Sequence, residues 1–101
     1  MERFRVIVSA KAQSDIAECI SFVKNISIEA ANELVNDLYS SFSSLDAFPE
    51  KNPVFEMPKA FPFILRKQVI NKRYIVLYTV EEHNVVIYRV LDSRRKFSHL
   101  V

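Results

Sequence analysis

Residues 72–95, KRYIVLYTVEEHNVVIYRVLDSRR, decide the fold of this chain. They contain two apolar segments, residues 74–80 and 85–91, which are rich in β-branched and aromatic residues and are joined by a short polar turn. Neither segment alternates cleanly between apolar and polar residues, so both faces of these strands must be at least partly covered. The stretch predicts a β-hairpin at the centre of a sheet. Its turn, residues 81–84, has no glycine, so Asn84 is the best candidate for a positive φ there.

A single charge interrupts the second apolar segment. By simple alternation Arg89 shares a face with Val85, Ile87 and Leu91. Burial of an unpaired guanidinium is costly, so this face is expected to open to solvent or to a ligand near the end of the strand.

Two further strands and two helices are predicted outside this hairpin. Residues 4–9 (FRVIVS) predict a first strand, and residues 63–70 (FILRKQVI) predict a strand with Arg66 and Gln68 on one face. Ser9 and Ser27 are suitable N-caps for the two helices between these strands, which we expect to form an antiparallel hairpin. The second helix has the clearer apolar periodicity, at Ala31, Leu34, Val35, Leu38, Phe42 and Leu45.

All four prolines lie in residues 48–62, FPEKNPVFEMPKAFP. Proline disfavours a helix or a central strand, so this segment is predicted to be a constrained connection. Its large apolar side chains indicate that it packs against the domain. We therefore expect one domain over residues 1–101, without an internal boundary.

Composition narrows the class of protein. Half of the 101 residues are apolar and 26% are charged, as is usual for a globular domain that buries its own core. The single cysteine, Cys19, excludes an internal disulfide, and with only two histidines a Cys/His zinc site is also excluded. No signal peptide or membrane-spanning run is evident, so we expect a cytoplasmic protein without metal or cofactor and without a membrane partner.

Charge is divided unequally along the chain. Residues 1–58 carry five Lys/Arg and nine Asp/Glu, a balance of −4, whereas residues 59–101 carry nine and three, a balance of +6. A basic half of this kind indicates a polyanionic partner, either nucleic acid or an acidic protein segment.

The order of these elements is accompanied by three characteristic segments, LDAFPEKNP (45–53), RKQVINKRYIVLYTV (66–80) and VVIYRVLDSRRKFSHLV (85–101). In this order and spacing, the chain resembles the RelE/ParE superfamily of toxins from bacterial type II toxin–antitoxin modules. Nearly the whole chain takes part in the resemblance. It implies an α+β fold of order β-α-α-β-β-β, in which a helical hairpin packs on one face of a mostly antiparallel four-stranded sheet. The opposite, concave face is expected to be basic.

The resemblance also implies a growth-inhibiting toxin, of the kind associated with plasmid stabilisation, and a cognate antitoxin that is acidic and folds as it wraps the toxin. Operator DNA would be bound only through the antitoxin. ParE-like members resemble poisons of DNA gyrase without chemistry of their own, whereas RelE-like members resemble ribosome-dependent mRNA endonucleases. The long second helix and LDAFPEKNP favour the ParE branch slightly, and an inactive co-repressor that only binds its antitoxin remains a further alternative.

For a nuclease, the resemblance places catalytic roles on Arg94 and Arg66, with His99 as a substitute for a missing terminal tyrosine. Two other RelE-like basic positions fall on Gln68 and Ile75 and are therefore unfilled. For partner binding, the predicted residues are Arg66, Arg73, Arg89, Arg94 and Arg95. Of these, Arg66, Arg89, Arg94 and Arg95 are expected to cluster on one face of the sheet.

Overall fold

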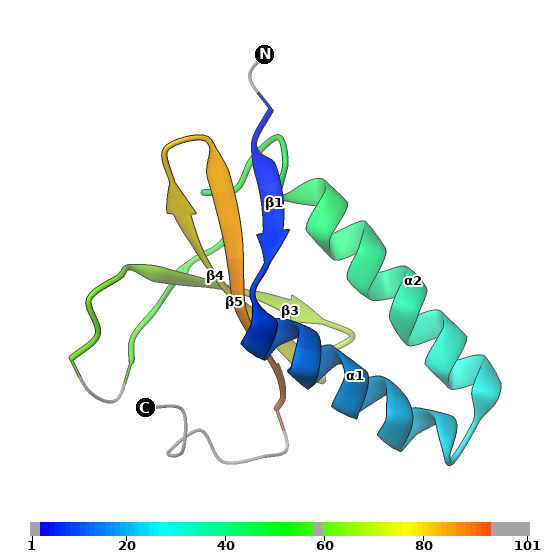
Figure 1. The fold of residues 1–101 in the computed structure, drawn as a ribbon. Helices are drawn as coiled ribbons and strands as arrows, with labels where there is room; N and C mark the ends of the chain where they lie inside the picture. Colours follow the sequence, from blue (N-terminus) through cyan, green and yellow to red (C-terminus); the bar gives the residue numbers. More distant parts are fainter. Residues whose placement is uncertain (1–2, 58–59, 94–101) are drawn as a thin grey trace.

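A two-helix layer covers one side of a five-stranded sheet in the computed structural model, which describes residues 3–57 and 60–93 (Figure 1). The prediction of an α+β fold is confirmed. In chain order the elements are β1 (Arg5–Val8), α1 (Ala10–Lys24), α2 (Ile28–Ser44), β2 (Val54–Phe55), β3 (Leu65–Ile70), β4 (Tyr74–Glu81) and β5 (Asn84–Asp92).

The sheet has the order β1-β5-β4-β3-β2, in which β1 pairs with β5 in parallel and all other pairs are antiparallel. The hairpin of β4 and β5 therefore occupies the interior of the sheet, as predicted. The expectation of four strands was wrong, because Val54 and Phe55 form an additional short strand at the edge. Two residues are too few to give a periodic signal, and the preceding Pro53 is tolerated at a sheet edge, where its carbonyl accepts from the Lys67 amide.

Serine side chains start both helices, as predicted. The Ser9 hydroxyl accepts a hydrogen bond from the Ala12 amide, and the Ser27 hydroxyl accepts one from the Ala30 amide. One predicted core position differs: Val35 is 45% exposed, while Leu34 and Leu38 beside it are buried. The apolar arc of α2 is therefore wider than the surface that the sheet covers.

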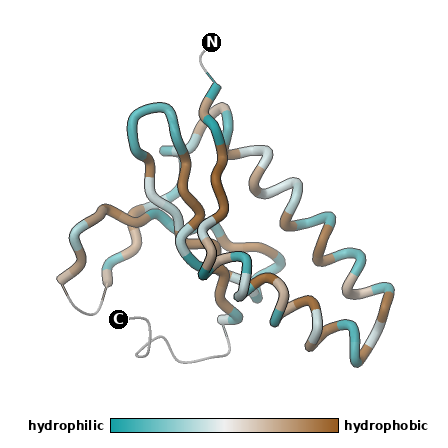
Figure 2. The backbone as a smooth tube through the Cα atoms, in the orientation of Figure 1, coloured by the Kyte–Doolittle hydropathy of each residue, from teal (hydrophilic) through white to brown (hydrophobic). Residues whose placement is uncertain are grey.

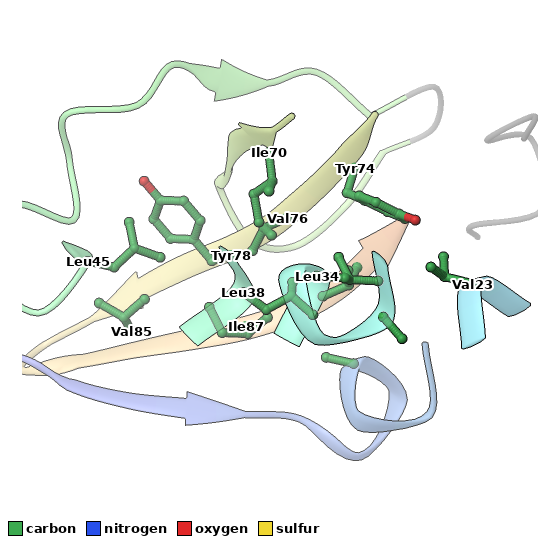
Figure 3. Packing of buried hydrophobic residues seen from close by; sticks show 13 residues of the cluster. Val23, Leu34, Leu38, Leu45, Ile70, Tyr74, Val76, Tyr78, Val85 and Ile87 are labelled. Atoms are coloured by element: carbon green, nitrogen blue, oxygen red, sulfur yellow. The ribbon is translucent and has the colours of Figure 1, made fainter. Parts of the chain in front are cut away.

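The main core lies between the helices and the sheet. Tyr74, Val76 and Tyr78 of β4 define this side, which we call the helix face (Figure 3). Hydrophobic residues run along β1 and β5, whereas the turn between β4 and β5 is hydrophilic (Figure 2). The buried members of the cluster are Ala12, Val23, Ala31, Leu34, Leu38, Leu45, Ile70, Tyr74, Val76, Tyr78, Val85, Ile87 and Val90.

The opposite side of the sheet, which we call the outer face, has a smaller core. Leu77 and Leu91 are buried there beneath Phe55, Met57 and Ile75. The proline-rich connection therefore packs against the domain, as predicted, and covers part of the outer face.

Among the described residues, 3–57 and 60–93, three have a positive φ: Asn71 (54°), Lys72 (57°) and Glu82 (54°). The first two are the central residues of the turn between β3 and β4, which the hydrogen bond from the Arg73 amide to the Ile70 carbonyl closes. The prediction for Asn84 was wrong, because Asn84 pairs with Glu81 in the strand ladder.

Candidate functional site

An irregularity in β5 decides where its charged residue points. Tyr78 pairs with Ile87, but the preceding Leu77 pairs with Arg89, so Tyr88 is an extra residue in the strand. A β-bulge of this kind changes which side chains lie on each face. Arg89 consequently shares the outer face with Leu77 and Leu91, and not, as alternation predicted, with Val85 and Ile87.

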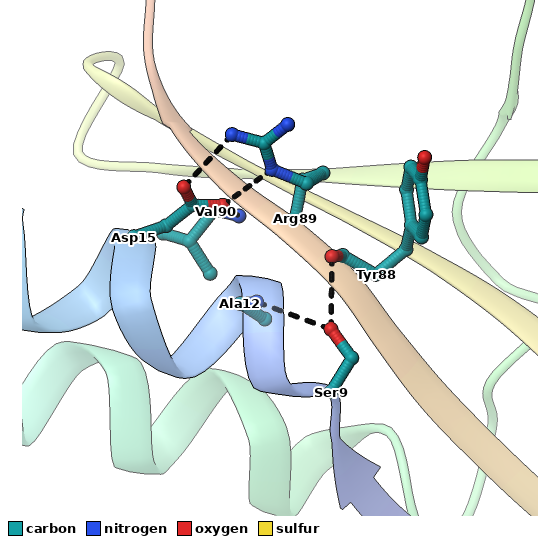
Figure 4. Close-up of polar contacts among 6 residues, drawn as sticks. All are labelled: Ser9, Ala12, Asp15, Tyr88, Arg89 and Val90. Atoms are coloured by element: carbon teal, nitrogen blue, oxygen red, sulfur yellow. Dashed lines mark hydrogen bonds and ion pairs between the residues drawn. The ribbon is translucent and has the colours of Figure 1, made fainter. Parts of the chain in front are cut away.

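The Arg89 guanidinium is engaged by Asp15 of α1 (Figure 4). Its Nε donates to Asp15 Oδ2 at 2.7 Å and its Nη2 donates to Oδ1 at 2.9 Å. The Val90 amide donates to the same carboxylate at 3.0 Å. These hydrogen bonds and the neighbouring carboxylate charge raise the pKa of Arg89. The charge is therefore neutralised within the domain, and the outer face needs no ligand to explain it.

The start of α1 is fastened to the same part of β5. β1 pairs with β5 only as far as Ile87, so the β5 edge beyond that residue is not covered by a strand. Ser9 donates through its hydroxyl to the Tyr88 carbonyl at 3.0 Å, and Asp15 binds one turn and a half further along (Figure 4). The first turns of α1 thus replace β1 along the bulged end of β5.

Arg66 lies on the other face of the sheet. It pairs across the strands with Tyr78, which belongs to the core of the helix face. Its Nη1 donates to the Asn52 carbonyl at 2.7 Å and to the Glu50 carbonyl at 3.3 Å. Arg66 therefore holds the connection that follows α2 against the end of the sheet.

Tyr78 also binds the connection between α2 and β2, through its hydroxyl group. Its buried hydroxyl donates to the Pro49 carbonyl and accepts from the Asn52 side chain at 3.1 Å. Burial raises the pKa of Tyr78, although the Asn52 hydrogen bond and the Arg66 charge partly oppose this shift. The Tyr78 phenol is consequently neutral near pH 7 and acts as a structural group.

Arg73 lies beside the C-terminal end of β5. Its guanidinium lies 5.2 Å from the centroid of the Tyr74 ring, and its Nη2 is 3.5 Å from Asp92 Oδ2. The Arg73 carbonyl accepts from the Ser93 amide at 2.6 Å. This arginine therefore ties the turn before β4 to the end of β5.

The predicted arginine cluster is thus divided. Arg66 and Arg89 lie on opposite faces, so the expectation that they share one surface was wrong. Gln68 and Ile75 also lie on opposite faces of the sheet. Gln68 contacts Ser41 of α2 on the helix face, whereas Ile75 packs on the outer face. The remaining predicted site residues, Arg94, Arg95 and His99, lie outside the described residues.

The strands of the outer face are less basic than the resemblance implied. In the described strands, its cations are Arg5, Lys67 and the paired Arg89, and its central residues are apolar.

Among residues 3–57 and 60–93, no group of His, Cys, Asp or Glu side chains is placed to hold a metal ion. In that same part of the chain, no helix is long and apolar enough to cross a membrane.

Sequence reasoning missed an apolar groove between β1 and α2. The groove has a volume of about 360 Å³. We call it the β1–α2 groove. Tyr39 of α2 is 75% exposed although it belongs to a helix whose neighbouring stripe is buried, and it is the residue that indicates the groove. Its lining residues are Phe4, Val6, Val8, Tyr39, Phe42, Ser43 and Asp46.

Comparison with known proteins agrees with this architecture. The sequence model of the family described as "ParE toxin of type II toxin-antitoxin system, parDE" matches residues 6–97. A solved structure described as the chromosomal ParDE TA system from P. aeruginosa has a similar fold, with a TM-score of 0.69 and 18% sequence identity over 88% of this chain and 95% of that chain. No curated protein matched the sequence. Because the family match spans nearly all of the described fold, this chain belongs to the ParE toxin family of type II toxin–antitoxin systems.

Proposed function

We propose that this toxin arrests bacterial growth by poisoning DNA gyrase, and that its cognate antitoxin relieves the arrest. The separation of Arg66 from Arg89 is the observation that carries the proposal. Both guanidiniums already have partners within the domain. On this proposal the toxin binds its target and forms no covalent bond itself.

A nuclease would need a different arrangement. Cleavage of a phosphodiester requires cationic side chains that converge on the phosphate and groups that move protons. Arg66 lies beneath the connection after α2, Gln68 faces the helices, and Ile75 is apolar. These three positions favour a binding toxin over a ribosome-dependent nuclease.

The RelE-like nuclease remains the second candidate because Arg94 matches the arginine that follows the last strand in RelE-like members. It would act with His99 as the proton-transfer group and with the basic residues of the chain end. The third candidate, an inactive co-repressor, would bind its antitoxin and reach operator DNA through it without arresting growth.

Partner binding is proposed for Arg73, Arg94 and Arg95, together with any surface that Arg66 and Arg89 retain outside their internal contacts. An acidic antitoxin segment would be attracted by the balance of +6 in residues 59–101. The proposed compartment is the cytoplasm, where both gyrase and the ribosome are found, and growth arrest of this kind would support plasmid stabilisation.

The proposal is tested by inducing the chain alone and together with its antitoxin. We expect growth arrest, trapped gyrase–DNA complexes and relief by the antitoxin. Codon-positioned 5′ ends in mRNA, with gyrase unaffected, would instead support the nuclease. Uninterrupted growth together with antitoxin binding would support the co-repressor.

A further inference from the structure

The pairing of β3 with β4 stops before β4 ends. Its last pair joins Arg66 and Tyr78, whereas β4 continues beside β5 as far as Glu81. The same register would place Ile64 opposite Val80, but within the described part of the chain no backbone hydrogen bond joins these two residues. The strand that the sequence predicted is therefore two residues longer at this end than the β3 of the structure.

The backbone groups of Val80 point to the side on which β3 is missing. The carbonyls of His83 and Ile87 accept hydrogen bonds from the β1 side, so every second residue from His83 to Ile87 directs its backbone groups towards β1. Val85 is one of these residues, and Val80 lies opposite it. The two valines therefore form a pair without mutual hydrogen bonds, and the N–H and C=O groups of Val80 are directed away from β5.

A pocket of about 290 Å³ occupies the place of the missing pairs, and residues 62–64 and 79–81 both line it. Phe63 is 52% exposed and Ile64 is 70% exposed, although both are residue types that favour strands. Pro62 would lie opposite the β4–β5 turn in a longer β3, where its missing N–H group would leave no ladder bond unmade. The sequence of this segment is therefore compatible with an extension of β3.

Phe61 fastens this segment to a different part of the sheet. Its ring centroid lies 5.2 Å from that of Tyr88 and 5.8 Å from that of Phe63. Tyr88 is the bulged residue of β5 and lies level with Tyr78. Because Arg66 pairs with Tyr78, an extended β3 would place Phe61 opposite position 83, five residues beyond Tyr78 and roughly 17 Å away at about 3.3 Å per residue. The contact between Phe61 and Tyr88 and the extension of β3 therefore exclude each other.

We propose that residues 62–64 form a strap that closes on β4 and extends β3 by two residues when Phe61 leaves Tyr88. In the closed form the backbone groups of Ile64 bond those of Val80, and the Ile64 side chain joins Val80 on the helix face. Closure removes the pocket and covers apolar surface that the open form exposes. A partner that contacts Phe63 and Ile64 in their exposed positions selects the open form. The device belongs to the toxin alone and does not depend on the target.

The test traps the closed form with a disulfide. In I64C/V80C the two thiols lie opposite each other only when the strap is closed, whereas in the control I64C/T79C the second thiol is on the other face of β4. Both pairs are made with Cys19→Ala, so that no third thiol competes. The rate of disulfide formation with glutathione disulfide is measured on the purified full-length chain at several protein concentrations. Circular dichroism checks the fold of each variant.

We expect I64C/V80C to form its disulfide within one chain at least about tenfold faster than I64C/T79C. Addition of Phe61→Ala should raise the I64C/V80C rate at least about fivefold, because it removes the aromatic contact that opposes closure. Phe48→Ala removes an exposed ring from the same connection and should leave the rate within about twofold. In oxidised I64C/V80C the amide of residue 80 should exchange its hydrogen at least about 100-fold more slowly than in the reduced form.

Equal rates for the two cysteine pairs would overturn the proposal, and this comparison does not require that Phe61→Ala folds. A folded Phe61→Ala variant with an unchanged I64C/V80C rate would also overturn it. Disulfides between chains, at a rate that rises with protein concentration, would indicate pairing between two copies instead of a strap. An oxidised form in which the amide of residue 80 still exchanges as fast as in the reduced form would show that β3 has not been extended, which contradicts the proposal as well.

Discussion

A variant that lacks the Asp15 carboxylate should unfold at a much lower temperature than the wild-type domain. The carboxylate accepts three hydrogen bonds, two from Arg89 and one from the Val90 amide. Truncation of one partner of a buried ion pair costs about 3–5 kcal/mol, because the other charge is left without compensation. The Asp15 and Arg89 side chains are 11% and 16% exposed, so the lower end of that range applies.

We therefore expect Asp15→Ala to lower the free energy of unfolding by about 3 kcal/mol. In a domain of this size each kcal/mol corresponds to a change of about 4–8 °C in Tm, which gives a decrease of roughly 12–24 °C. The assay is thermal and urea unfolding of the purified chain, followed by far-UV circular dichroism.

Two controls make the result specific to the ion pair. Arg3→Ala removes the exposed pair with Asp46 and should cost less than about 1 kcal/mol. The double variant D15A/R89M should be more stable than the sum of the single variants predicts, because it leaves no buried charge. A loss of under about 1 kcal/mol for Asp15→Ala, or strict additivity in the double variant, would refute the structural role that we assign to this pair.

Three further substitutions test separate features. Burial raises the pKa of Tyr78, so the stability that the neutral phenol contributes is full below about pH 10 and is lost as the pH rises towards the pKa of the folded state. Tyr78→Phe should therefore reduce the decline in unfolding free energy above about pH 10, and an unchanged decline would argue against this assignment. Lys72→Gly should raise stability by about 0.5–1 kcal/mol, because Lys72 has a φ of 57°, and a loss of stability in urea unfolding would contradict this reason. Arg66→Ala should increase proteolysis of the connection at Glu50 while growth arrest persists; loss of arrest without a change in proteolysis would indicate a direct role in the target site.

The fold was largely predictable because its signals are local. The β-branched and aromatic residues of the hairpin, the serine caps and the periodicity of α2 are signals that depend only on neighbouring residues. The elements that they predicted were each confirmed. β2 was not predictable from its own two residues. Its formation depends on the pairing of Val54 and Phe55 with a strand that lies ten residues further along the chain.

The surroundings of the candidate site were less predictable because they depend on long-range geometry. Simple alternation placed Arg89 beside Ile87, and one bulged residue, Tyr88, moved it to the other face. Its partner Asp15 is 74 residues away in the sequence, so no local pattern links the two side chains. Val35 was assigned to the core because its spacing fits the buried stripe, but its side chain is 45% exposed.

Gyrase activity in the presence of the purified toxin is the measurement that tests the proposed function most directly. The toxin is added to gyrase, ATP and relaxed plasmid, with and without the antitoxin, and supercoiling and trapped double-strand breaks are measured. The account predicts inhibited supercoiling and accumulated gyrase–DNA breaks, both reversed by the antitoxin. Normal supercoiling at toxin concentrations that produce codon-positioned mRNA cuts on translating ribosomes would contradict it.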